Sequence, residues 1–192
     1  MNFEAREIKK IVREGYQILL RAEASLLLPI EQKEIGRYYE TLGEKCMQWA
    51  VEVHGDQLRR RFLSLESAAE KARFPMERYR FSMRCILEAR GRAVLLCESR
   101  LQASGGGMEN EYRRISHVWN LEEETVLPMA QILQAFDVRA KRRELPFRPD
   151  GVYPAGGDMI FFKNPTPDAP FSEFRIPLSE ECLRKWEMRY NN

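Results

Sequence analysis

The chain has 192 residues, a length that suits one domain, or one domain with an appendage, and that can bury a sizeable core. Its 44% hydrophobic and 31% charged residues are typical of a soluble globular protein. Lysine and arginine number 31 against 29 acidic residues, so the formal net charge is only +2. This balance argues against a nucleic-acid partner, because proteins that bind nucleic acids concentrate basic charge on one face.

The sequence also bears on the compartment of the protein. The first fifteen residues lack the continuous apolar region of a signal peptide, and no run of about 18 apolar residues predicts a membrane span. We therefore expect a cytoplasmic protein. The four cysteines (Cys46, Cys85, Cys97 and Cys182) are widely spaced, with no Cys-x-x-Cys pair, so the sequence predicts neither a metal site nor a cofactor. Free buried thiols are expected, and two disulfides are the alternative for an exported chain.

The N-terminal segment is open to two interpretations. Residues 5–13 suit a charged strand, or a helix with an apolar stripe on one face. Beyond the turn signal Glu14-Gly15, apolar residues alternate with polar ones from Tyr16 to Leu28, which is typical of a strand. We favour a hairpin, and the helical alternative for residues 3–13 stays open. Residues 1–15 are thus a strand or helix appendage, and residues 16–192 are predicted to form a single domain.

From Glu31 the apolar period changes to 3.6 residues, which predicts one long broken helix, or two helices, over residues 31–73. Gly36 and Gly43 cost such a helix about 1 kcal/mol each relative to alanine, unless they let another element approach closely. A break or kink is expected at His54-Gly55-Asp56, and Phe74-Pro75 ends the segment.

Three extended runs follow: Tyr79–Ala89, Ala93–Leu101 and Glu111–Leu121. Arg90-Gly91-Arg92 separates the first two, and Ser104-Gly105-Gly106-Gly107 predicts a turn between the last two. Three successive antiparallel strands form a meander, and the remaining chain is expected to cover one of its faces. After it, Pro128 is expected to open a short helix over Met129–Phe136.

The last quarter is rich in proline and glycine and predicts four short strands: Phe147–Arg148, Gly151–Tyr153, Met159–Lys163 and Glu173–Ile176. Ser179 is a good N-cap for a helix over Glu180–Tyr190, which presents Cys182, Leu183 and Trp186 to the sheet. The predicted fold class is α+β, a mainly antiparallel sheet with the long helix and the C-terminal helix packed on one face.

Candidate reactive residues are few. His54 and His117 are the only histidines, and the sequence pairs neither with a nucleophile, so structural or surface roles are expected. Glu122-Glu123-Glu124 crowd a turn without a second acidic cluster, and the glycine triplet joins two strands, unlike a phosphate loop. Arg59-Arg60-Arg61 and the basic residues of 139–143 are expected to be solvated. No catalytic or metal-binding residue is predicted.

Several short motifs in this order carry a resemblance to a known family. They include Leu28-Pro29, Ser116-His117-Val118-Trp119-Asn120-Leu121, Phe147-Arg148-Pro149-Asp150-Gly151-Val152 and Ile176-Pro177-Leu178-Ser179-Glu180. Over roughly residues 16–185 the chain resembles the C-terminal domain of the RsiV family, bacterial anti-sigma factors and their relatives. That domain also accompanies some peptidoglycan deacetylases, and most members are exported or membrane-anchored. The chain has Gly106-Gly107-Met108-Glu109 where the family usually has Gly-Gly-Ala-His.

The resemblance implies a domain that senses or binds other molecules, and the anti-sigma member binds lysozyme. We therefore expect a non-enzymatic binding or sensing module that recognises a protein or a cell-wall glycan, with a hydrolytic enzyme as the alternative. The chain's oligomeric state stays open.

The expected binding surface lies in the loops Pro149–Gly157 and Asn164–Phe171, with Pro149, Asp150, Tyr153, Asn164 and Phe171 as candidate binding residues. Proline lowers the entropy that a loop loses on binding, and aromatic residues anchor interfaces. In the other interpretation, Tyr153 and Phe171 fix their loops to the sheet. Alternation lets only one of Phe161 and Phe162 face the core, so the other is either covered by the C-terminal helix or exposed.

Overall fold

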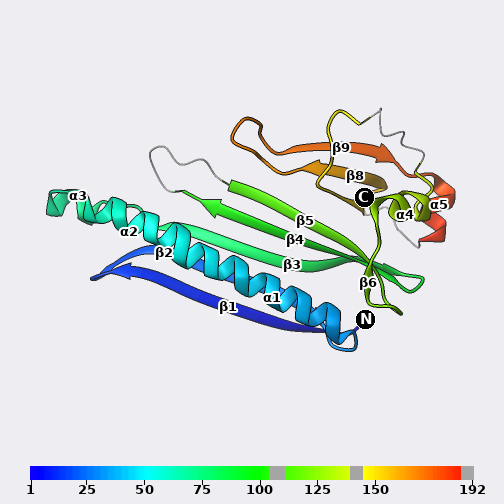
Figure 1. The fold of residues 1–192 in the computed structure, drawn as a ribbon, viewed down its shortest axis with the longest axis horizontal. Helices are drawn as coiled ribbons and strands as arrows, with labels where there is room; N and C mark the ends of the chain where they lie inside the picture. Colours follow the sequence, from blue (N-terminus) through cyan, green and yellow to red (C-terminus); the bar gives the residue numbers. More distant parts are fainter. Residues whose placement is uncertain (104–110, 139–144, 187–192) are drawn as a thin grey trace. The chain divides into compact units, whose positions relative to one another are not determined.

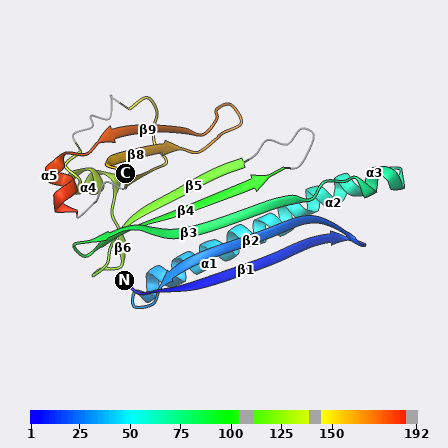
Figure 2. The same ribbon diagram turned by 180° about the vertical axis from the view of Figure 1, so that it is seen from behind.

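The computed structural model describes residues 1–103, 111–138 and 145–186. Six strands form one sheet in the order β1-β2-β3-β4-β5-β6, and three more form a second sheet in the order β7-β8-β9 (Figures 1 and 2). The strands are β1 (Phe3–Glu14), β2 (Gln17–Pro29), β3 (Glu77–Ala89), β4 (Arg92–Gln102), β5 (Glu111–Asn120), β6 (Thr125–Val126), β7 (Gly151–Ala155), β8 (Asp158–Lys163) and β9 (Ser172–Pro177).

The helices are α1 (Lys33–Trp49), the π-helical turn η1 (Ala50–His54), α2 (Gly55–Leu63), α3 (Ala68–Ala72), α4 (Met129–Ala135) and α5 (Glu180–Lys185). The predicted α+β class is confirmed, with a mainly antiparallel set of strands, one long helix and a C-terminal helix. None of the helices in the described residues is long and apolar enough to cross a membrane.

The chain divides into two compact units, which are considered one at a time. The N-terminal unit comprises residues 2–82 and the described part of 99–112. The C-terminal unit comprises Met1, residues 83–98 and the described residues from 113 onward. Because β3, β4 and β5 contribute residues to both, the two units are linked by continuous strands.

In the N-terminal unit, β1 pairs with β2 in an antiparallel hairpin, with Phe3 opposite Pro29 and Glu14 opposite Gln17. The strand interpretation of the N-terminal segment is therefore confirmed, and its helical alternative is wrong. Along β2 the burial alternates as expected: Leu20, Ala22, Ala24 and Leu26 are buried, and the residues between them are exposed. Gly15 makes the turn with a φ of +56°, in the left-handed region that glycine adopts without strain.

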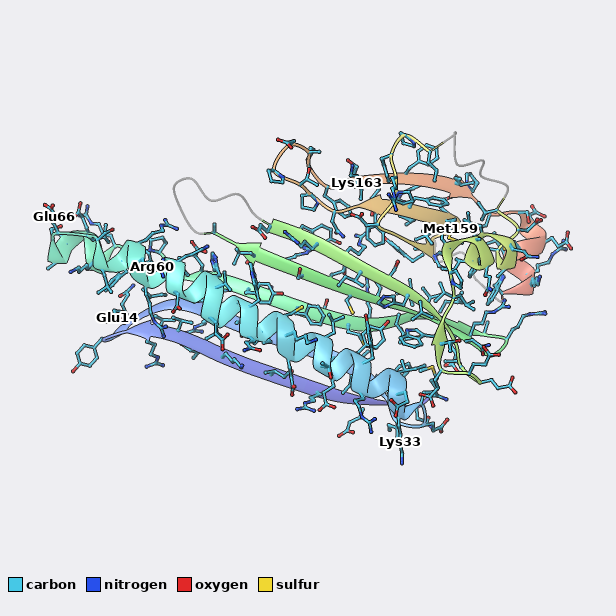
Figure 3. The ribbon with its side chains drawn as sticks, in the orientation of Figure 1. Glu14, Lys33, Arg60, Glu66, Met159 and Lys163 are labelled. Carbon is cyan, nitrogen blue, oxygen red and sulfur yellow. The ribbon has the colours of Figure 1, made fainter. Side chains whose placement is uncertain are left out.

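Helices α1, η1 and α2 follow one another without interruption from Lys33 to Leu63 and lie along the hairpin (Figures 1 and 3). The predicted break at His54 is a π-helical turn, and a separate short helix, α3, begins after the N-cap Ser67. Three glycines of the helix face the hairpin. A Cβ atom on Gly36 would lie 3.0 Å from the carbonyl oxygen of Pro29. A Cβ atom on Gly43 would lie 2.9 Å from a methyl carbon of Leu26, and one on Gly55 would lie 2.8 Å from a methyl carbon of Val12. These glycines let the helix approach the strands closely.

In the C-terminal unit, one apolar core joins the two sheets and the last two helices. It includes Val94, Leu96 and Val118 from β4 and β5, with Ile160 and Phe161 from β8. Cys182, Leu183 and Trp186 are buried, as predicted. The Trp186 ring stacks on Phe136 with the ring centres 4.4 Å apart, and its Nε1 donates to the carbonyl of Ala135 at 3.1 Å.

Two predictions about local elements need correction, and three lie outside the described residues. Phe147–Arg148 is not a strand. Phe161 and Phe162 are both fully buried, so the interpretation that one of them is exposed is wrong. Phe162 is covered by the rings of Tyr153 and Phe171. The Ser104-Gly105-Gly106-Gly107 turn, the basic residues 139–143 and residues 187–190 of the predicted last helix lie outside the described residues.

Candidate functional site

The strongest polar cluster in the C-terminal unit is centred on Arg114 of β5. Strand alternation places residue 114 on the same side of β5 as Val118, which belongs to the core. The Arg114 side chain is accordingly only 11% exposed. Its Nη1 donates to Glu173 Oε1 and to the Tyr153 hydroxyl, and its Nη2 donates to Glu98 Oε1 at 3.2 Å. A largely buried guanidinium is thus held between two carboxylates from different sheets.

Aromatic rings enclose the same guanidinium. Its central carbon lies 5.0 Å from the ring centre of Phe171, 5.1 Å from that of Tyr153 and 5.7 Å from that of Phe162. A cation within about 6 Å of a ring centre is attracted by the negative face of the ring, and more strongly where water is excluded. Arg114 therefore holds both polar and aromatic residues of β7, β8 and β9 against β5.

The backbone of Arg114 is also engaged. Its N–H donates to Asn164 Oδ1 at 2.7 Å, and the Asn164 Nδ2 donates to its carbonyl at 2.9 Å. The side-chain amide of Asn164 thus satisfies both the backbone N–H and the backbone C=O of Arg114, which in a sheet would pair with a neighbouring strand. In the opposite direction, a side chain of β5 bonds to the backbone of β7. The Ser116 hydroxyl accepts from the Val152 N–H at 3.1 Å and donates to the Val152 carbonyl at 2.8 Å.

Most of the residues predicted to form the binding surface meet at this cluster. Tyr153, Asn164 and Phe171 contact Arg114 directly, and Asp150 reaches it indirectly by accepting a hydrogen bond from the backbone N–H of Asn164 at 2.8 Å. None of these contacts involves Pro149, the residue before Asp150. Tyr153 is just 6% exposed and Phe171 is half-buried, which favours the interpretation that they fix their loops to the sheet.

The loop between Asn164 and Phe171 is braced at both ends by Arg114. Within it, the Thr166 N–H donates to the Ala169 carbonyl at 2.9 Å, and the Ala169 N–H donates back at 3.2 Å. Pro167 and Asp168, at the tip of this tight turn, are exposed. The arrangement presents a short, pre-ordered loop on a rigid base.

Arg114, Glu98 and Glu173 were not singled out from the sequence. The signal that was available is the position of Arg114, because a charged residue in phase with Val118 lies on the core-facing side of its strand. Partners of opposite charge are expected for such a residue. Which carboxylates supply them depends on strands that are distant in sequence.

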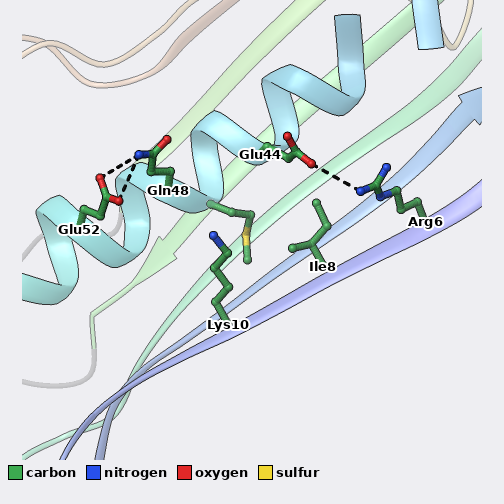
Figure 4. A pocket seen from close by; sticks show the side chains of 7 residues that line it. Arg6, Ile8, Lys10, Glu44, Gln48 and Glu52 are labelled. Atoms are coloured by element: carbon green, nitrogen blue, oxygen red, sulfur yellow. Dashed lines mark hydrogen bonds and ion pairs between the residues drawn. The ribbon is translucent and has the colours of Figure 1, made fainter. Parts of the chain in front are cut away.

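A separate groove lies in the N-terminal unit, between β1 and the long helix (Figure 4). It has a volume of about 380 Å³ and is lined by Arg6, Ile8, Lys10, Glu44, Met47, Gln48 and Glu52. The Gln48 amide donates to both carboxylate oxygens of Glu52, at 3.0 and 3.1 Å. Arg6 forms ion pairs with Glu40 and Glu44.

The two histidines occupy different surroundings. His54 Nε2 lies 2.6 Å from Glu77 Oε2, both residues are almost fully buried, and the indole of Trp49 stacks on the imidazole. The carboxylate of Glu77 and the ring of Trp49 explain the burial of His54 as a structural role, so no catalytic role is needed to account for it. His117 lies in β5 against Trp119, and burial lowers its pKa. Among the described residues, no group of three or more His, Cys, Asp or Glu side chains is placed to hold a metal ion.

The fold is similar to that of two crystal structures. One is a DUF3298 family protein from Pseudomonas aeruginosa, with a TM-score of 0.50 and 16% identity, covering 95% of this chain and 91% of the other. The second is a member of the DUF3298 family from Bacteroides fragilis, with a TM-score of 0.51 and 12% identity, covering 96% and 92%. At these identities the likeness concerns the fold alone. No family model and no curated protein matches the chain.

Proposed function

We propose that this chain is a non-enzymatic binding or sensing module that recognises a protein partner through the loop Asn164–Phe171. The observation that carries the proposal is that one residue, Arg114, fixes both ends of this loop. Loops on a rigid scaffold are common binding elements, and a pre-ordered loop loses little entropy when it binds. Tyr153 and Phe171 are then positioning residues, and the exposed tip meets the partner.

The RsiV-type resemblance supports the same proposal, since that domain senses or binds other molecules. The resemblance also suggests two ligands for a binding test, lysozyme and cell-wall glycan. Sugar rings are usually held against exposed aromatic faces, and the two aromatic residues of these loops are engaged with Arg114. A protein is therefore the partner that we propose, and glycan binding is the competing outcome.

Binding of lysozyme and of soluble peptidoglycan fragments to the full chain tests the proposal by isothermal titration calorimetry. We expect lysozyme to bind and Asp168→Arg, at the loop tip, to weaken binding at least about tenfold through reversed charge. Glu122→Arg is the matched control, because Glu122 is also exposed and lies in the same unit, on a different turn.

Two results would contradict the proposal. One is that neither probe binds. The other is that Asp168→Arg weakens binding no more than Glu122→Arg does. Binding of glycan fragments alone would reject the protein partner and favour a glycan.

A further inference from the structure

The strand β1 is an edge strand. It is the first strand in the order of the six-stranded sheet, and in the part of the chain that the structure describes it pairs only with β2. An edge strand presents backbone N–H and C=O groups that another extended chain can pair with. With twelve residues, β1 offers a long edge of this kind.

The groove between β1 and the long helix lies beside this edge. Arg6, Ile8 and Lys10 line it from β1, and because they alternate along the strand they share the face that looks toward the helix. Opposite residues of paired strands point to the same face, so every second side chain of an added strand would project toward this groove. Extended peptides bind other proteins in this way, with backbone pairing for affinity and pockets for specificity.

The lining gives the groove a definite chemistry. Ile8, half-buried, and Met47, fully buried, form its apolar part. Arg6 is neutralised by Glu40 and Glu44 at one end. At the other end Gln48 holds the carboxylate of Glu52, as Figure 4 shows.

Lys10 is left as the cation available to a ligand. It is exposed, lines the groove, and has no ion-pair partner within the described residues. An acidic side chain on an added strand could therefore form an ion pair with Lys10, and an apolar side chain could pack against Ile8. Because a strand added antiparallel to β1 runs from the level of Lys10 to that of Ile8, it meets the lysine first and the isoleucine two residues later.

We propose that the edge of β1 and this groove bind an extended segment of a partner protein, by antiparallel strand addition, at the motif acidic-x-apolar. The site is distinct from the loop Asn164–Phe171 and does not depend on it.

A second copy of this chain is a poorer occupant. In β1 itself, the residues two positions after Glu4 and Glu7 are Arg6 and Lys9, so the strand lacks the motif. A self-pairing register that places Glu4 opposite Lys10 also places Arg6 opposite Ile8, a charge against the apolar part of the groove. Charges on an edge strand can also serve simply to prevent pairing, and the experiment separates that role from binding.

Random decapeptides displayed on phage, selected on the full-length protein, provide the test. We expect acidic-x-apolar sequences to be enriched. Lys10→Glu should remove this enrichment and weaken a selected synthetic peptide about tenfold in fluorescence anisotropy, because it replaces attraction with repulsion. Lys9→Glu is the control: it makes the same charge change one residue away on the opposite face of β1, where Lys9 pairs with Glu7 at 2.7 Å and does not line the groove. Circular dichroism and thermal melting check that both variants are folded.

Amide chemical shifts locate the bound peptide, and those of β1 should change on titration. Several results would overturn the proposal: no enriched motif, an enriched motif that Lys10→Glu leaves intact or Lys9→Glu removes equally, or shift changes away from β1. Sedimentation tests the competing occupant. A dimer that Lys10→Glu dissociates would assign the edge to a second copy and reject the peptide partner.

Discussion

Arg114 shows how a charged residue occupies a core-facing position of a strand. Burying a charge is costly unless it is paired and hydrogen-bonded, and here the planar guanidinium reaches two carboxylates, a phenol and three aromatic rings. The arginine therefore joins β5 to the second sheet by hydrogen bonds and an ion pair, whereas an apolar residue at this position would contribute packing alone.

Replacing Arg114 by methionine should destabilise the protein by about 3 kcal/mol, because it leaves the partly buried Glu98 and Glu173 without their shared partner. Arg175→Met is the control: Arg175 also pairs with Glu173, but its side chain is 58% exposed, so its loss should cost less than about 1 kcal/mol. Urea unfolding of the three proteins measures the difference. Equal losses would mean that Arg114 contributes no more than a surface ion pair.

His117 should make stability depend on pH. Burial lowers its pKa below the ordinary value of 6.5, so the unfolded chain takes up a proton at a higher pH than the folded chain does. As the pH falls below about 6.5, protonation therefore favours unfolding and this part of the stability is lost. We expect wild-type protein to lose more stability between pH 7.5 and 5.5 than His117→Gln does. Parallel slopes in urea titrations would contradict this.

At the scale of elements, the long helix depends on how closely it approaches the hairpin. Gly43 and Gly55 both face β-strand side chains, but the neighbours differ. Both neighbours are buried, but Gly43 meets the flexible end of Leu26, whereas Gly55 meets Val12, which is branched at Cβ and restricted in its rotamers. The same residue type thus has different structural importance at its two positions.

Gly55→Ala should therefore destabilise the protein by a net of about 1 kcal/mol. Overpacking against Val12 costs more than the roughly 1 kcal/mol that alanine gains over glycine in helix propensity. Gly43→Ala should be neutral or slightly stabilising, because Leu26 can move aside. Thermal unfolding of the two variants checks the contrast. A stabilising Gly55→Ala would show that the helix and the hairpin have room to separate at this point.

At the scale of the whole molecule, β3, β4 and β5 belong to both compact units. Unfolding one unit would remove part of the same strands that the other one uses. We therefore expect the chain to unfold in one cooperative transition.

The reactivity of the cysteines can show whether the two units unfold together, because all four cysteines are free and each unit contains at least one. Burial raises the pKa of Cys46, in the N-terminal unit, and of Cys182, in the C-terminal unit, which slows alkylation of the folded protein. In pulsed alkylation with mass spectrometry, both should become reactive at the same urea concentration. Two separate midpoints would show that the units unfold independently. Four reactive thiols are expected in the denatured, non-reduced protein.

The sequence by itself determined the elements that periodicity and turn chemistry specify. Alternation from Tyr16 to Leu28 indicated β2, the 3.6-residue period after Glu31 indicated the long helix, and Ser179 indicated the start of α5. These signals are local, so the residues that carry them act within a few positions of one another. The charged segment 3–13 was ambiguous, because only its pairing with β2 makes it a strand.

Tertiary structure alone decided the candidate sites. The contacts of Arg114 join residues 16 to 59 positions apart in the sequence, and no local pattern specifies such pairs. The same holds for Phe162, whose burial depends on Tyr153 and Phe171, and for the groove, which forms only where β1 and the helix lie side by side. Periodicity shows which face of an element is buried, but which residues meet there is set by the packing of elements distant along the chain.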